Sequence, residues 1–471
     1  MKKKLSITCL VTLLTLMIAC HCGEATQPGT DQNSVGDGNT SVGEGVGGCA
    51  QSVGNVFEPA QGFDFIIGTA LFAPASVPKP NKCTPITDTH FGTRITRITN
   101  TGEYAGPGIE NEYARSDPEN SDGTHLLLRA NNGDWLLYNA HTFEMISQLT
   151  GLIEQGGEEL EPRWDATDPN VFYYVDGTLL RSYNVATHTP TTLRDFRQDF
   201  PNAAYVTTKT EGDASLDRRY WCLLVENTNM VPVAVVVYDK NSNTLVGIKT
   251  SFKDGINWVS MDMSGSHCVI GYEDSDNDGD EITPPAEAFS RDFATATVLP
   301  TGANGHMDLA LTRDGRDVMV YQNNSTDFIE MADLTTGTAT PLLAIPFGTN
   351  SDIGIHVSGN SSATPGWALI STYGAKVPPE GQTHSWMDNQ VFLLELTASP
   401  RIWRLAHTHA YTSDGYNPDQ PVNYFAEAFA TINKSGTKIF FGSNWDIFTD
   451  IEYTDAYQIN LPSHWYSTLS P

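Results

Sequence analysis

The chain has 471 residues, of which 39% are hydrophobic and 10% aromatic, and it carries a formal net charge of −29 at pH 7. This hydrophobic content is enough for a sizeable core, and the abundance of Tyr, Phe and Trp favours β-structure. The negative charge excludes general binding to nucleic acid or to anionic membranes, because like charges repel, although it still permits a local cationic pocket.

The N-terminus has the features of a targeting segment. Three lysines, Lys2 to Lys4, precede an apolar run from Leu5 to Ile18, which is followed by Ala19 and Cys20. The junction resembles the bacterial lipobox, although Met17 stands where Leu is usual, and plain secretory cleavage is the alternative. We therefore expect residues 1–19 to be a signal peptide and Cys20 to be lipidated, which predicts an exported protein anchored in the bacterial cell envelope, at the outer membrane or the cell surface.

The next two segments precede the main repeat. Residues 20–56 are rich in Gly, Ser, Thr and Asn, which predicts a flexible tether, and residues 57–92 form a lead-in with few clear elements. In an oxidising compartment Cys49 and Cys83 are expected to form a disulfide that fixes the end of the tether to the domain. Cys222 and Cys268 lie in strand-like runs, so we expect them to be buried small hydrophobic residues.

Residues 93–471 are organised as repeated β-units. The stretch from Gly305 to Gln322 alternates polar and apolar residues, turns at Asp314-Gly315 and returns as a second strand, which indicates a hairpin. Seven such units follow one another at a spacing of about 45 to 50 residues, without a convincing amphipathic helix, and this is typical of an all-β, seven-bladed β-propeller. The last unit lacks its outer strand, so we predict that the strand around Arg94 to Thr99 completes the last blade. A pair of β-sandwiches is the alternative, but it would not explain the repeat length.

Three segments carry a resemblance to a known group. They are Glu161-Pro-Arg-Trp, the unit that begins at Gly305-His-Met-Asp, and Glu427-Ala-Phe-Ala-Thr-Ile with the strand after Ser435. They resemble seven-bladed propellers of the TolB and oligogalacturonate-lyase-like group over roughly Thr93 to Pro462. The resemblance implies the fold more strongly than an activity.

Two histidines and a glutamate form the first candidate site. His306, His356 and Glu427 each stand eight positions before the turn of three consecutive units. Because the first strand of every blade lines the central channel, these side chains are expected to converge there and to bind a divalent cation such as Zn²⁺ or Mn²⁺, with Asp308 as a supporting or fourth ligand. The resemblance supports this placement, since oligogalacturonate lyases hold a metal with histidines of their last blades. The alternative is that these groups only hydrogen-bond to water and backbone.

Earlier units supply candidate catalytic groups. A polysaccharide lyase needs a cation that neutralises the uronate and a base that removes the α-proton. Arg163, together with a cation at His306 and His356, fits the first role. Either Tyr113, which lies near Arg115 in the sequence, or a histidine fits the second. The alternative is that Arg163 pairs with Glu158, Glu159 or Glu161, and that Trp164 belongs to the core.

A second candidate metal site is an acidic loop. Asp274, Asp276 and Asp278 alternate and precede Gly279, as in a calcium-binding loop. The twelfth position is Pro285 instead of the bidentate Glu of an EF-hand, so the pattern is partial. We expect a structural Ca²⁺ site here, with a solvated acidic hairpin as the alternative.

These features together predict an exported propeller that binds an acidic polysaccharide, with a divalent metal at the channel mouth, and that also acts on it as a lyase. The alternative is a non-catalytic scaffold of the cell envelope that binds a protein or a glycan. In both cases the membrane is reached only through the lipid anchor, and nucleic acid is not a partner.

Overall fold

β-Strands make up almost all of the regular structure. The computed structural model describes residues 49, 65–104, 106, 108–156, 159–273, 285–300, 305–349, 353–377, 383–415, 423–448 and 453–469. Residues 46–471 form one compact unit. The predicted signal peptide, Cys20 and the rest of the predicted tether apart from Cys49, and the acidic loop with Asp274, Asp276 and Asp278 lie outside the described residues. Within the described part of the chain, no helix combines the length and apolar character needed to cross a membrane.

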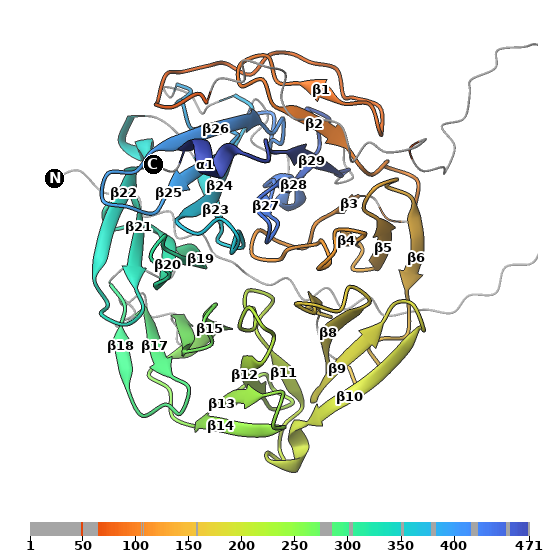
Figure 1. The fold of residues 1–471 in the computed structure, drawn as a ribbon, viewed down its shortest axis with the longest axis vertical. Helices are drawn as coiled ribbons and strands as arrows, with labels where there is room; N and C mark the ends of the chain where they lie inside the picture. The colour runs from red at the N-terminus through yellow and green to blue at the C-terminus, as the bar shows by residue number, and fades with distance from the viewer. Residues whose placement is uncertain are drawn as a thin grey trace, which may run out of the picture. The chain divides into compact units, whose positions relative to one another are not determined.

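Among the described residues the strands form six sheets, which make up the seven blades of a propeller (Figure 1). Five of them are separate four-stranded sheets, and the first and last blades are joined by a single residue pair, Asp455 and Ile109. The inner strands are β3 (Ile109–Glu110), β7 (Arg163–Trp164), β11 (Tyr205–Thr207), β15 (Gly255–Met261), β19 (Gly305–Leu311), β23 (Gly354–Ser358) and β27 (Thr431–Ile432). The second strands are β4 (His125–Ala130), β8 (Val171–Asp176), β12 (Tyr220–Glu226), β16 (His267–Glu273), β20 (Asp317–Asn323), β24 (Trp367–Tyr373) and β28 (Lys438–Ser443).

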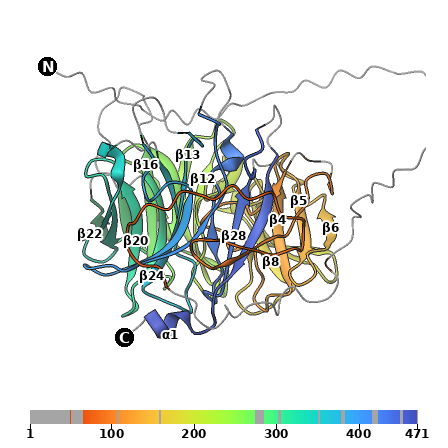
Figure 2. The ribbon, with the colours of Figure 1, turned by 90° about the horizontal axis from the view of Figure 1, so that it is seen from above.

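The outer half of each blade repeats the same order. The third strands are β5 (Trp135–Asn139), β9 (Leu179–Asn184), β13 (Pro232–Asp239), β17 (Ala286–Ser290), β21 (Phe328–Asp333), β25 (Gln390–Glu395) and β29 (Asp455–Asn460). The outer strands of the first six blades are β6 (Met145–Leu149), β10 (Thr189–Asp195), β14 (Thr244–Lys249), β18 (Ala296–Val298), β22 (Ala339–Ala344) and β26 (Ile402–His407). Helical turns are short: η2 (Phe196–Gln198), η3 (Pro346–Thr349), η4 (Tyr424–Ala426) and the helix α1 (Trp465–Leu469), which lies at one face of the disc in Figure 2.

The last blade is completed by the N-terminal strand. Strand β2 (Arg94–Arg97) pairs antiparallel with β29, with Ile95 opposite Ile459 and Arg97 opposite Tyr457, and β1 (Ile86–Thr87) adds to its outer edge. This confirms the predicted seven-bladed propeller and its closure by a strand from the other end of the chain. Closure protects the sheet edges that an open arrangement would expose.

The core lies between neighbouring blades. On β19, Met307 and Leu309 pack against Trp258 of the preceding blade, whereas Ala310 on the opposite side packs with Ile355 of the following blade. A propeller strand is therefore buried on both faces, and each buried Leu or Ile stabilises the fold by about 1.5–3 kcal/mol. The turn after β19 contains Gly315 with φ of +80°, a conformation that favours glycine.

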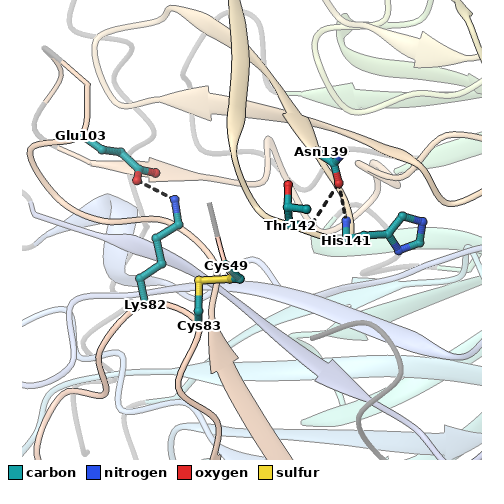
Figure 3. The surroundings of a disulfide bond; sticks show 7 residues. All are labelled: Cys49, Lys82, Cys83, Glu103, Asn139, His141 and Thr142. Atoms are coloured by element: carbon teal, nitrogen blue, oxygen red, sulfur yellow. Dashed lines mark hydrogen bonds and ion pairs between the residues drawn. A yellow bond between two sulfur atoms is a disulfide. The ribbon is translucent and has the colours of Figure 1, made fainter. Parts of the chain in front are cut away.

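The lead-in is fastened to the ring at several points. Cys49 and Cys83 form the predicted disulfide, with their Cα atoms 5.5 Å apart (Figure 3). The Cys49 backbone N–H donates to the Thr142 carbonyl at 2.6 Å, and Lys82 pairs with Glu103 at 2.6 Å. These contacts attach the segment to the first blade, and β1 and β2 then continue it into the last one.

The other two cysteines are buried as predicted, but the prediction that they act only as small hydrophobic residues was wrong. Cys222 on β12 and Cys268 on β16 are fully buried, as expected, but they form a disulfide between the third and fourth blades with Cα atoms 5.4 Å apart. The two strands belong to different sheets, and the sequence contains no signal for the register between blades. Their pairing could therefore not be read from the strand pattern.

Candidate functional site

The three predicted metal ligands meet in the central channel. His306 is the second residue of β19, His356 lies in the middle of β23, and Glu427 follows η4 just before β27. The Nε2 atom of His356 is 3.0 Å from Oε2 of Glu427, and the rings of His306 and His356 are 5.0 Å apart and nearly perpendicular. The structure therefore brings these side chains from the fifth, sixth and seventh blades to one place.

A bulge and a glycine orient the side chains of His306 and His356. The register of β19 and β20 shifts between Gly305 and Met307, so His306 occupies a bulge, a device that re-aims a side chain. Opposite Gly354 of β23 stands Tyr373, and a Cβ atom on Gly354 would lie only 1.9 Å from the tyrosine ring. The glycine thus lets the Tyr373 ring lie across the inner strand, where it stacks on His356 at 4.9 Å.

Aromatic rings enclose His356. Besides Tyr373, the Phe429 ring lies 4.7 Å away and the Tyr113 ring 5.2 Å away at a steep angle. The Tyr373 hydroxyl hydrogen-bonds to Glu427. Tyr373 and Phe429 were missed in the sequence. The pairing of a glycine with a tyrosine on adjacent strands was the one signal that would have indicated Tyr373.

Burial keeps the histidines neutral and favours the protonated form of the carboxyl. It lowers the pKa of both His306 and His356 to about 3, and the neighbouring Arg115 cation acts in the same direction. Burial also raises the pKa of Glu427 to about 7, against the opposing effect of His306. Burial likewise raises the pKa of Tyr113 far above 10, with Glu211 adding to the shift. At neutral pH the site therefore offers two neutral imidazoles, a phenol and a carboxyl that a further cation would ionise.

The structure does not bring Arg163 to this cluster. Every nitrogen of its guanidinium donates to a protein acceptor: Nη1 to Glu112 Oε2 at 2.8 Å and to the Pro162 carbonyl, and Nε and Nη2 to the Gly212 carbonyl. Its nearest carboxylate partner, Glu112, comes from the first blade, and Asp213 lies 3.8 Å from its Nε. It forms no ion pair with Glu159 or Glu161, and Glu158 lies outside the described residues. Trp164 is buried, as expected.

Asp308 hydrogen-bonds to the backbone and not to either histidine. Its Oδ2 accepts the Gly359 N–H at 2.6 Å, and its Oδ1 accepts the Leu309 N–H at 2.8 Å. It lines a small cavity with Asp213 and Lys434, and burial raises its pKa to about 7. These backbone contacts fix the Asp308 carboxylate, and none of them involves His306 or His356.

Arg115 supplies a cation beside the cluster, close enough to affect the pKa of both histidines. Its guanidinium lies 5.6 Å from the Tyr113 ring centre and 5.9 Å from that of Trp258, and its Nη1 donates to Glu211 at 2.8 Å. Trp258 has room because Gly271 stands opposite it, where a Cβ would lie 2.1 Å from the indole nitrogen. Glu211 had no recognisable sequence signal.

Two further histidines, His407 at the end of β26 and His409 two residues later, make contacts elsewhere. The His407 side chain bonds to the Phe72 carbonyl and approaches Asp88, and the His409 ring lies against Trp445. Neither of these contacts involves the channel cluster.

Comparisons with known proteins show likeness in fold only. No protein family matches the sequence, and no curated protein does. Among solved structures, an oligogalacturonate lyase from Vibrio parahaemolyticus is similar, with a TM-score of 0.56 and 14% identity over 81% of this chain and 97% of the other. An oligogalacturonate lyase in complex with manganese gives a TM-score of 0.53 and 15% identity over 84% and 96%. These are β-propeller neighbours. The expected likeness to TolB stays a prediction.

The donor set fits a first-row divalent cation. Two neutral imidazoles and one carboxylate are common ligands of such ions. At present Nε2 of His356 and Oε2 of Glu427 are hydrogen-bond partners 3.0 Å apart, so an ion bound between them would replace this hydrogen bond. Among the described residues, however, no group of three His, Cys, Asp or Glu side chains is arranged so that it could hold a metal ion. His306 would have to turn toward the other two.

Proposed function

We propose that the channel mouth binds an acidic polysaccharide with the help of a divalent cation, and that the protein cleaves it by elimination. The observation that carries the proposal is the convergence of His306, His356 and Glu427 beside Arg115 and Tyr113. The two lyase neighbours, one of them a manganese complex, add support through their fold.

The charge of the protein explains why a cation matters here. A chain with a formal charge of −29 repels a polyanion unless positive charge is concentrated at the binding point. Arg115 provides one such charge, and a cation held by the two histidines and Glu427 would supply a second. Together they would neutralise the uronate carboxylate, which acidifies the proton on the adjacent carbon.

The elimination requires that one proton be removed from carbon and that one be supplied to the departing oxygen. Because both histidines would hold the cation, Tyr113 is the base: its phenolate accepts the proton next to the carboxylate, the bond to the glycosidic oxygen breaks as the double bond forms, and the departing oxygen takes a proton from solvent. Burial raises the pKa of the Tyr113 hydroxyl, whereas Arg115 and a bound cation would lower it and so favour the phenolate that this step requires. Arg163 is assigned to positioning, since its guanidinium holds the Gly212 carbonyl.

The test is an assay of eliminative cleavage. The purified protein is incubated with pectate, ulvan or alginate fragments and Mn²⁺, and absorbance of the unsaturated product is followed. We expect product from one of them, and we expect Tyr113→Phe to lower kcat by about 100-fold or more. Tyr183→Phe is the matched control, because that hydroxyl contacts His188 in the second blade. Absence of product with all three polymers would eliminate the lyase reaction and leave binding alone.

We further propose that the protein is exported and lipid-anchored through Cys20. The support is the sequence of residues 1–20. Under this proposal the tether would separate the channel mouth from the membrane and let it meet polymers that cannot enter the cell. The scaffold alternative shares this placement.

A further inference from the structure

Arg115 is a nearly buried cation with an unusual set of partners. Its side chain is 5% exposed, and it reaches from the first blade to the Trp258 ring of the fourth. Its Nη1 donates to the Glu211 carboxylate at 2.8 Å and to the Glu211 backbone carbonyl at 3.2 Å. Within the described residues these are the hydrogen bonds of its guanidinium, so Nε and Nη2 donate to no protein acceptor.

The donor pattern leaves one side of the guanidinium available. Arginine binds a carboxylate best through two parallel N–H···O bonds, and the Nε and Nη2 pair can form such a fork. Glu211 instead engages Arg115 through one nitrogen only. Its carboxylate is 27% exposed, so solvent or a ligand can compete for it.

The loop that carries Glu211 is held firmly by the second blade. The Glu161 carboxylate accepts the N–H groups of Thr208 and Thr210, and Arg163 grips the Gly212 carbonyl. A Cβ on Gly212 would lie 2.0 Å from the Val259 carbonyl, so the loop also packs directly on the fourth blade. The backbone of residue 211 is thus fixed, whereas its side chain can rotate away from Arg115.

We propose that Arg115 is the subsite for a ligand carboxylate, and that Glu211 is an internal carboxylate which the ligand displaces. The inference rests on the proposed function, because it names the group of the polysaccharide that this subsite recognises: the uronate carboxylate. Glu211 lowers the affinity for simple anions. A ligand must offer a carboxylate and further contacts, such as those at the His306 cluster, to replace it.

The Glu211 side chain can move toward solvent when a ligand displaces it. Glu211 is partly exposed, and Lys209, two residues earlier on the same loop, carries a cation that now pairs with Glu226. Binding of a ligand carboxylate exchanges one anion for another on Arg115, so the charge beside the histidines stays constant.

The test compares Glu211→Gln with the unchanged protein by calorimetry. The probes are D-galacturonate, acetate and the neutral sugar D-galactose. We expect Glu211→Gln to bind D-galacturonate about tenfold more tightly, because removing a competing charge partner frees the cation. D-Galactose should show no change. Glu144→Gln, which removes a charge from an exposed position, is the matched control and should behave as the unchanged protein. Glu211→Ala, measured in the same way with its folding checked by its Tm, should show the same direction.

The outcomes separate this inference from the proposed function. If neither D-galacturonate nor acetate binds Glu211→Gln more tightly than it binds the unchanged protein, but D-galacturonate binds both proteins, Glu211 is a structural partner and the inference is overturned while uronate binding stands. If D-galacturonate gains nothing but acetate binds Glu211→Gln more tightly, the carboxylate subsite stands and the uronate assignment is overturned. No binding of any carboxylate to either Glu211 variant would overturn the subsite itself.

Discussion

Burial and the nearest partner decide the charge of each imidazole in this protein. His306 and His356 are neutral because burial lowers their pKa to about 3. His267 is the opposite case, because its Nδ1 lies 2.7 Å from Asp262 and this hydrogen bond raises its pKa against the effect of burial. The same residue type thus serves as a neutral group in the channel and as half of an ion pair on β16.

His267 leads to a prediction about pH. Because its pKa is higher in the folded than in the unfolded protein, the protonated form stabilises the fold below the unfolded pKa, and this contribution is lost as the pH rises through the folded pKa. We expect His267→Gln to lower the urea midpoint more at about pH 5.5 than at about pH 8.5. His141→Gln, at an exposed position, is the control. An equal loss at both pH values would show that the ion pair does not form.

The residues of the site differ in how far the sequence could identify them. His306, His356 and Glu427 stand at one repeat position, so a ring of similar units must bring them together. Arg163 stands at a comparable position, yet its partner Glu112 belongs to another blade and holds it in place. Glu211 and Tyr373 act through loop geometry and strand register, which depend on contacts between blades and leave no local pattern.

At the scale of the element, strand β2 matters most for stability, because it closes the ring. Strand β2 comes from the N-terminal side of the propeller and completes the sheet of the last blade. Its Ile95 is 1% exposed and packs in the cluster with Ile459 and Trp403. The strand therefore joins the two ends of the domain through buried apolar contact as well as backbone hydrogen bonds.

We predict that Ile95→Ala lowers the free energy of unfolding by about 2–5 kcal/mol, the cost of emptying a buried aliphatic site. Ile67→Ala is the matched control, because Ile67 is 56% exposed and its truncation should cost less than about 0.5 kcal/mol. Urea unfolding measures both. Similar losses for the two variants would mean that β2 does not seal the ring.

Strands and their order were predictable, whereas contacts between sheets were not. Alternation of apolar residues and turns such as Asp314-Gly315 mark strands locally. The missing outer strand of the last unit was enough to predict the closure by β2. The Cys222–Cys268 disulfide joins two sheets whose relative register is set by side-chain packing, and the bulge at His306 is equally invisible in the periodicity.

At the scale of the whole molecule, closure of the ring brings together side chains that are far apart in the sequence. His306 and Glu427 are separated by more than two blades of sequence, yet both lie beside His356. Beside His356, this acidic protein therefore has a buried site that combines two imidazoles, a carboxyl group and the Arg115 cation. This arrangement depends on closure, because each side chain comes from a different sheet.

The most direct test of this account is the metal content of the purified protein after dialysis with Mn²⁺ or Zn²⁺. The account predicts one equivalent of bound divalent metal, lost in His306→Ala and in His356→Ala but retained in His267→Ala, with all three variants checked for folding. Absence of bound metal, or equal metal content in folded protein with and without His356, would contradict the proposed site.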